Sequence, residues 1–221
     1  IPSTFLVVSG RIIVMKKLLL SKKGRHLISY YKDMVTNGYE NDLFNLKFYK
    51  SIIKEKFNYF NVKSVLDYGG GRSDWHSKSF NDDKNLSAKD FFNLQTINTY
   101  EPSTNTDLRQ KSDCVICFDV LEHVFIGDIK NVLCDIFNNA KKIVIIQIAC
   151  YPAKAKLPNG ENAHITIRHP LWWKGLIDCI SLDYRDISIV LMCSTEYKKT
   201  TVFNTWTANE WMQGNNFTTN I

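Results

Sequence analysis

The sequence has no run of about 18 consecutive apolar residues, the length that a helix needs to cross a bilayer. It has no internal repeat and no low-complexity linker. Cys114 and Cys117 form a C-x-x-C, but no second pair of Cys or His follows at the spacing of a zinc finger. Residues three apart on a strand also point to opposite faces. We therefore expect no membrane association and no metal cofactor.

The N-terminal residues lack the order of a secretory signal, because the positive charges follow the apolar run of residues 1–8 instead of preceding it. Met15 is the expected natural start, and residues 1–14 are expected to be a poorly ordered upstream extension. Most of the six cysteines stand in apolar runs, which is typical of buried, reduced thiols. Reduced thiols indicate a cytoplasmic protein.

The composition is that of a globular protein, since 44% of the 221 residues are hydrophobic and 23% are charged. The net charge of +6 is unevenly distributed: residues 1–63 carry 12 Lys and Arg against 4 acidic residues, and the remainder is slightly acidic. A basic segment is compatible with binding nucleic acid or an anionic surface. We favour the other interpretation, in which these residues form a solvated helical face.

The order of expected elements predicts an α/β fold with a doubly wound, mostly parallel, Rossmann-like sheet. Apolar spacing favours a helical cap within residues 15–60, with Gly38 separating two helices, and residues 61–221 form the core of a single domain. The last two strands lack a clear helix between them, so we expect an antiparallel pair at the sheet edge. Strands are expected at residues 62–67, 94–100, 113–118, 142–150, 187–193 and 200–206, and helices at 126–139 and 171–180.

The most informative stretch is Val65-Leu66-Asp67-Tyr68-Gly69-Gly70-Gly71, a strand that runs into a glycine turn. Such a turn lets a ligand approach the backbone at the carboxyl edge of the sheet. The dinucleotide fingerprint needs a further glycine where this chain has Asp74, and the phosphate loop G-x-x-x-x-G-K-[ST] is absent. Asp67 would repel a pyrophosphate but suits a cationic ligand. S-adenosylmethionine, which carries a sulfonium and an ammonium and no phosphate, fits that chemistry.

Two more acidic residues follow expected strands. Glu101 ends the second strand, where a carboxylate can accept both hydroxyls of a ribose, and Asp119 follows the third strand at the same edge. Asp90 is an alternative ribose ligand at a more usual spacing, but it does not end a strand. Three acids at one sheet edge favour a single ligand site.

These motifs resemble the class I S-adenosylmethionine-dependent methyltransferases over about residues 61–150. The resemblance rests on Asp67-x-Gly69-x-Gly71, on Glu101, and on the stretch from Asp113 to Val124, of which L-E-H-V is the most specific part. It implies that the first acid and the glycines contact the methionine moiety and that Glu101 holds the ribose. Asp119 with Val120 would line the methionine end, and Asp107 would approach the adenine amine. Only 11 residues separate Glu101 from Asp113, too few for the family's usual third strand and helix.

Each of these residues also has a purely structural interpretation. Asp67 could cap the following helix, Glu101 could be a surface acid, and His123 could be a structural residue at a helix start. His164, in the polar loop after the fifth strand, titrates in the range of a general base and is the first catalytic candidate, with His123 the second. His164 could instead only hydrogen-bond its own loop.

The predicted activity is methyl transfer from S-adenosylmethionine to a small-molecule acceptor. An aromatic, basic lid over residues 24–60 would suit an anionic acceptor. The sequence has no D-P-P-Y-like tetrapeptide and no Pro-Cys nucleophile, which disfavours two classes of nucleic-acid methyltransferase. Two other functions stay open: a non-catalytic protein that binds S-adenosylmethionine, and a nucleic-acid or protein methyltransferase that docks through its basic N-terminal segment.

Overall fold

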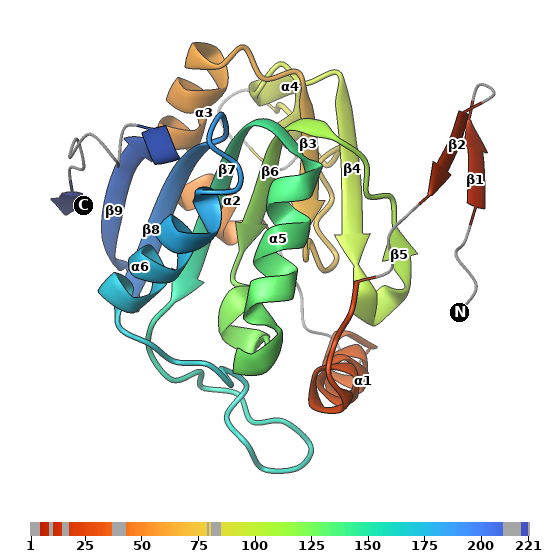
Figure 1. The fold of residues 1–221 in the computed structure, drawn as a ribbon, viewed down its shortest axis with the longest axis vertical. Coiled ribbons are helices and arrows are strands. Elements are labelled where there is room, and N and C mark those ends of the chain that lie inside the picture. The colour runs from red at the N-terminus through yellow and green to blue at the C-terminus, as the bar shows by residue number, and fades with distance from the viewer. Residues whose placement is uncertain are drawn as a thin grey trace.

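The computed structural model describes residues 5–8, 11–14, 18–36, 43–78, 80, 85–209 and 218–220. Within these residues, seven strands between Ser64 and Trp206 form a mixed sheet, and a short eighth strand extends it at one edge (Figure 1). The strand order is β10-β9-β8-β7-β6-β3-β4-β5. The strands are β3 (Ser64–Tyr68), β4 (Thr96–Glu101), β5 (Thr106–Asp107), β6 (Ser112–Phe118), β7 (Ala140–Ala149), β8 (Ser188–Glu196), β9 (Lys199–Trp206) and β10 (Thr218–Asn220).

The five central strands are parallel, as continuous apolar strands separated by helices predict. β5, β9 and β10 are antiparallel to their neighbours. The antiparallel pairing of β8 with β9 confirms the arrangement expected for the last two strands of the core. The α/β class with a mostly parallel, Rossmann-like sheet is thereby confirmed.

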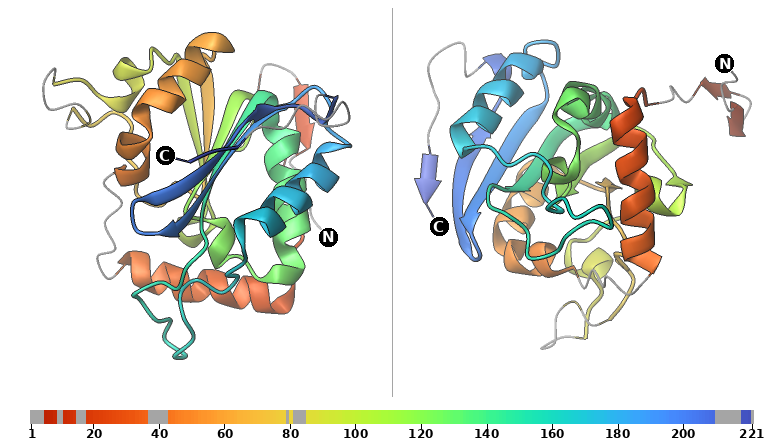
Figure 2. Two further views of the ribbon diagram at one scale, coloured as in Figure 1. Left: turned by 90° about the vertical axis from the view of Figure 1, so that its left-hand side faces the viewer. Right: turned by 90° about the horizontal axis from the view of Figure 1, so that it is seen from below.

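Both faces of the sheet are covered, as Figures 1 and 2 show. In β7, Val144 and Ile146 belong to the apolar cluster on one face, and Ile143 and Ile145 belong to the cluster on the other. The first face packs against α5 (Ile129–Asn139) and α6 (Pro170–Ser181), and the second packs against α2 (Phe44–Phe48), α3 (Lys50–Tyr59) and α4 (Ala88–Phe91). The two residues of the C-x-x-C motif fall into different clusters and are free thiols.

The N-terminal helical cap is also present. Its first helix, α1 (Lys22–Thr36), runs across the carboxyl ends of the parallel strands (Figure 2). Ser21 positions the start of α1: its hydroxyl accepts the Gly24 N–H, and its own N–H and O–H donate to the Asp128 carboxylate, both at 2.7 Å. Gly38 lies outside the described residues. Among the helices that the structure describes, none is both long and apolar enough to cross a membrane.

The structure differs from the expected elements in three places. Between β4 and β6 the chain forms only a 3-10 turn (Pro102–Thr104) and the two-residue β5, which agrees with the short spacing there. The helix expected at residues 126–139 begins three residues later, after a 3-10 turn. β1 (Phe5–Val8) and β2 (Arg11–Val14) pair in antiparallel fashion, which the sequence does not predict. The division into extension, cap and core stays a prediction.

Candidate functional site

The glycine turn after β3 requires glycine for two separate reasons. Gly69 has φ +80°, a left-handed conformation that side chains disfavour. A Cβ atom on Gly69 would also lie 2.4 Å from a methyl carbon of Val120. A Cβ atom on Gly70 would lie 2.5 Å from the Asp67 carboxylate. The turn therefore brings its backbone against both β3 and the segment that follows β6.

Asp67 is a buried carboxylate without a cationic partner. Its side chain accepts a hydrogen bond of 2.7 Å from the indole N–H of Trp75, and none of the ion pairs among the described residues includes it. Burial raises the pKa of Asp67 to about 6; the Trp75 bond opposes that rise and the charge of Glu101 adds to it. Asp67 does not cap a helix, because Ser87 caps α4. The site therefore presents negative charge that a cationic ligand would stabilise.

Glu101 holds two loops at the end of β4. One oxygen accepts the Gly71 N–H and the other accepts the Ser103 N–H, both at 2.8 Å. The residue is only 8% exposed, so the interpretation as a surface acid is wrong. The competing residue Asp90 instead accepts a bond from the Ser87 hydroxyl at the start of α4. Each Glu101 oxygen retains a second lone pair for a ligand.

Asp119 lies beside the glycine turn at the end of β6, in a left-handed conformation with φ 52°. Asn45 of α2 donates a hydrogen bond to its carboxylate, and its own N–H donates to Gln147. Burial raises the pKa of Asp119, while the hydrogen bonds from Asn45 and Gln147 lower it. The contact with Asn45 joins the N-terminal cap to the sheet edge, which the sequence pattern does not indicate.

Asp107 does not reach the other predicted site residues. Arg109 holds its two oxygens with bonds of 2.8 and 2.6 Å and also donates to Asp135. The guanidinium lies 4.4 Å from the centroid of the Tyr100 ring. Asp107 therefore forms a structural ion pair on β5, outside the cavity that the other residues line.

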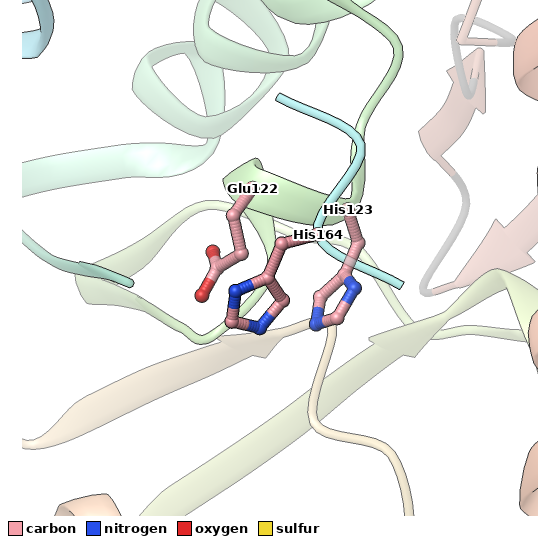
Figure 3. A group of neighbouring side chains, drawn as sticks. All are labelled: Glu122, His123 and His164. Carbon is pink, nitrogen blue, oxygen red and sulfur yellow. The ribbon is translucent and has the colours of Figure 1, made fainter. Parts of the chain in front are cut away.

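The two catalytic candidates lie next to each other, with ring centroids 5.0 Å apart (Figure 3). Nδ1 of His123 lies 2.8 Å from the Ala163 carbonyl and 3.2 Å from the Tyr31 hydroxyl. Nδ1 of His164 lies 2.5 Å from the Tyr151 carbonyl. Burial lowers the pKa of His123 to about 4, and the neighbouring His164 adds to this effect. His123 is therefore neutral at physiological pH and a weak base.

Glu122 completes this group, although the sequence suggested no role for it beyond the L-E-H-V resemblance. It has no exposed surface, and one of its oxygens accepts the Ala149 N–H at 2.9 Å. The other oxygen, Oε2, has no hydrogen-bond partner among the described residues. Burial, followed by the charge of Asp119, raises the pKa of Glu122 well above its usual range.

Almost all of these residues line one cavity of about 670 Å³ at the carboxyl edge of the sheet. α1 contributes apolar side chains and Tyr31 to its wall, and Lys154 is the one Lys or Arg that lines it among the described residues. The described Lys and Arg residues of the N-terminal helices thus do not line the cavity; Lys23, for example, forms an exposed ion pair with Glu161. The predicted site residues that line the cavity are Asp67, Gly69, Gly71, Glu101, Asp119, Val120, His123 and His164.

No protein-family model matches the chain, and no curated protein sequence matches it. The fold itself, a Rossmann-like sheet with a cavity at the carboxyl edge, is compatible with a nucleotide-binding enzyme.

Proposed function

We propose that the protein binds S-adenosylmethionine in this cavity and transfers its methyl group to a small-molecule acceptor. The observation that carries the proposal is the buried carboxylate of Asp67 beside the glycine turn, which has no cationic partner in the part of the chain that the structure describes. A carboxylate in that position favours a cationic ligand and disfavours a pyrophosphate. S-adenosylmethionine supplies a methyl group bound to a cationic sulfur.

Glu101 and Asp119 fit the remainder of such a cofactor. The free lone pairs of Glu101 suit two ribose hydroxyls, while the bonds from Gly71 and Ser103 keep the carboxylate in one orientation. Asp119 and Val120 line the same cavity, and Val120 lies against Gly69 of the glycine turn. Because Asp107 is held by Arg109 outside the cavity, the proposal assigns it no contact with the cofactor.

The protein's contribution to methyl transfer is mainly positioning and the exclusion of water, because the reaction is an in-line displacement. α1 covers the carboxyl edge of the sheet, and its apolar residues Leu27, Ile28 and Met34 line the cavity. A hydroxyl acceptor would also have to lose a proton. His164, the predicted base, lines the same cavity.

Calorimetric titration with S-adenosylmethionine and S-adenosylhomocysteine tests the proposal, with NAD and ATP as competing ligands. We expect saturable binding of the first two only. Glu101→Ala should weaken binding by about 1–3 kcal/mol, because it leaves polar groups of the cofactor without partners. The matched control is Asp107→Asn, which alters an acid outside the cavity and should leave affinity unchanged. Saturable NAD binding without any response to S-adenosylmethionine would refute the proposal.

A row of exposed aromatic rings supports a second acceptor class, a single-stranded nucleic acid. Phe44 stacks on Phe48 at 6.1 Å and on Tyr197 at 6.0 Å, with interplanar angles of 18° and 13°. Phe44 and Tyr197 also line the cavity, and Lys198 lies 5.3 Å from the Tyr197 ring centroid. Unpaired bases stack on such rings, and basic residues bind the backbone.

Fluorescence anisotropy with single-stranded RNA and DNA, measured at several salt concentrations, distinguishes the two acceptor classes. A nucleic-acid acceptor predicts binding that falls steeply with salt. Phe44→Ala should then weaken binding by about 1–3 kcal/mol. Tyr59→Ala removes an exposed ring of α3 that is outside the row and should have no effect. Absence of binding at low salt would exclude the nucleic-acid acceptor and retain the small-molecule acceptor.

A further inference from the structure

We propose that Glu122, His123 and His164 bind one divalent first-row transition metal ion at the wall of the cavity (Figure 3). One potential ligand atom from each side chain lies within 4.8 Å of the other two. Two ligand atoms on one ion with bonds of about 2.1 Å can lie at most about 4.2 Å apart. In a tetrahedral site the ligand atoms lie about 3.4 Å apart, so the side chains have to move closer together by about 1 Å to close around an ion.

The two imidazoles are oriented as metal ligands are. Nδ1 of His123 and Nδ1 of His164 each lie within hydrogen-bond distance of a backbone carbonyl, those of Ala163 and Tyr151. An N–H donated to each carbonyl places the proton on Nδ1 and leaves the lone pair on Nε2. Histidine ligands of metals are held in this way by a bond from the other ring nitrogen.

Glu122 provides an independent indication of a cation. Its Oε2 is fully buried and has no hydrogen-bond partner among the described residues, although Oε1 accepts the Ala149 N–H. The neighbouring Asp119 carboxylate is itself a hydrogen-bond acceptor, so it leaves Oε2 unsatisfied while both groups are ionised, and a buried polar atom in that state is costly. None of the ion pairs that the structure describes includes Glu122. A metal ion would satisfy this atom and join it to the two imidazoles.

The set of donors determines the kind of ion. Two imidazoles and one carboxylate suit Mn²⁺, Fe²⁺, Co²⁺ or Zn²⁺, while Mg²⁺ and Ca²⁺ prefer sites made of oxygen alone. The expectation of no metal rested on cysteine spacing. His123 and His164 are 41 residues apart in the sequence, so their proximity depends on the fold and not on a local motif.

The coordination positions that the protein leaves open face the cavity, because His123 and His164 both line it. A consequence, which rests on the proposed function, is that the methyl acceptor presents oxygen donors such as neighbouring hydroxyls. The metal would lower the pKa of the acceptor hydroxyl, and its proton would pass to water as the C–O bond forms and the C–S electron pair returns to sulfur. Nε2 of His164 cannot both bind a metal and accept a proton, so this assignment replaces its predicted role as a base.

The test is calorimetric titration of the tag-free, full-length chain with Co²⁺, Mn²⁺ and Mg²⁺ after treatment with EDTA, without any cofactor. We expect one equivalent of Co²⁺ or Mn²⁺ to bind, and Mg²⁺ to bind more weakly. His123→Gln and His164→Gln should each weaken Co²⁺ binding more than tenfold. His76→Gln changes an exposed histidine outside the cavity and is the matched control. Equal Co²⁺ affinity in all four proteins would overturn the assignment.

Pulsed electron paramagnetic resonance of the Mn²⁺-loaded wild type gives an answer that does not depend on how the variants fold. Coupling to two imidazole nitrogens supports the site, and the absence of nitrogen coupling overturns it. The experiment is separate from the cofactor titration. If Co²⁺ binds but S-adenosylmethionine does not, the proposed function is wrong and the metal site is retained. If S-adenosylmethionine binds but Co²⁺ does not, the metal site is wrong and the proposed function is retained.

Discussion

Replacing Asp67 with Asn should stabilise the protein in the absence of ligands. Burial raises the pKa of this carboxyl from an ordinary value of 3.8 to about 6. The folded state therefore binds the proton more tightly than the unfolded state, and the free energy of unfolding falls as the pH rises between these two values. The difference of about two pKa units corresponds to about 3 kcal/mol. Asparagine carries no charge and can still accept the Trp75 N–H through its side-chain oxygen.

Urea unfolding at pH 7.5 and at pH 4 measures the effect. We expect Asp67→Asn to raise the free energy of unfolding by about 2–3 kcal/mol at pH 7.5 and to have almost no effect at pH 4. Asp186→Asn changes an exposed aspartate and should behave like wild type at both values. The same variant should lose the stabilisation that saturating S-adenosylmethionine gives to wild type. A variant that is less stable at pH 7.5, or equally stabilised at both pH values, would refute the reasoning.

Further predictions concern stability and the N-terminal extension. Gly69→Ala should destabilise the fold by more than about 1 kcal/mol in urea unfolding, whereas Gly175→Ala, a helical position with open space around its Cβ, should stabilise it by about 0.4–1 kcal/mol. Lys174→Ala should lower the free energy of unfolding by about 3 kcal/mol, because it leaves the buried Asp178 carboxylate without its counter-ion. Removing residues 1–14 should leave the melting temperature and cofactor affinity unchanged, and a loss of either would contradict their assignment as an extension.

Sequence reasoning correctly predicted the elements that are marked by a local pattern, such as an apolar run or a cluster of glycines. The continuous apolar run of β7 predicted a strand that is covered on both faces, and β7 is buried in this way in the structure. The three glycines after β3 likewise indicated a turn at the sheet edge. The short spacing between Glu101 and Asp113 correctly indicated that a parallel strand and helix are missing there.

The parts that sequence reasoning missed depend on contacts between distant segments. Asp107 was a candidate that rested only on the methyltransferase resemblance, and Arg109, two residues away, holds its carboxylate instead. The position of α1 depends on the bonds between Ser21 and Asp128, 107 residues apart. Glu122 stood inside the most specific motif, yet its unsatisfied oxygen is visible only once the surrounding side chains are placed.

The left-handed backbone of Asp119 has a consequence for attempts to evolve this protein. A residue other than glycine at φ 52° costs about 1–2 kcal/mol, and asparagine tolerates this conformation better than most residues. Asp119→Asn would ease that strain, remove a partly buried charge and still accept the Asn45 amide. A library selected only for survival of heating should therefore be enriched in changes at Asp119 and at Asp67. Such a selection would locate the ligand site without any knowledge of the ligand. The substitutions that raise thermal stability would fall at positions where a residue kept for function lowers the stability of the fold.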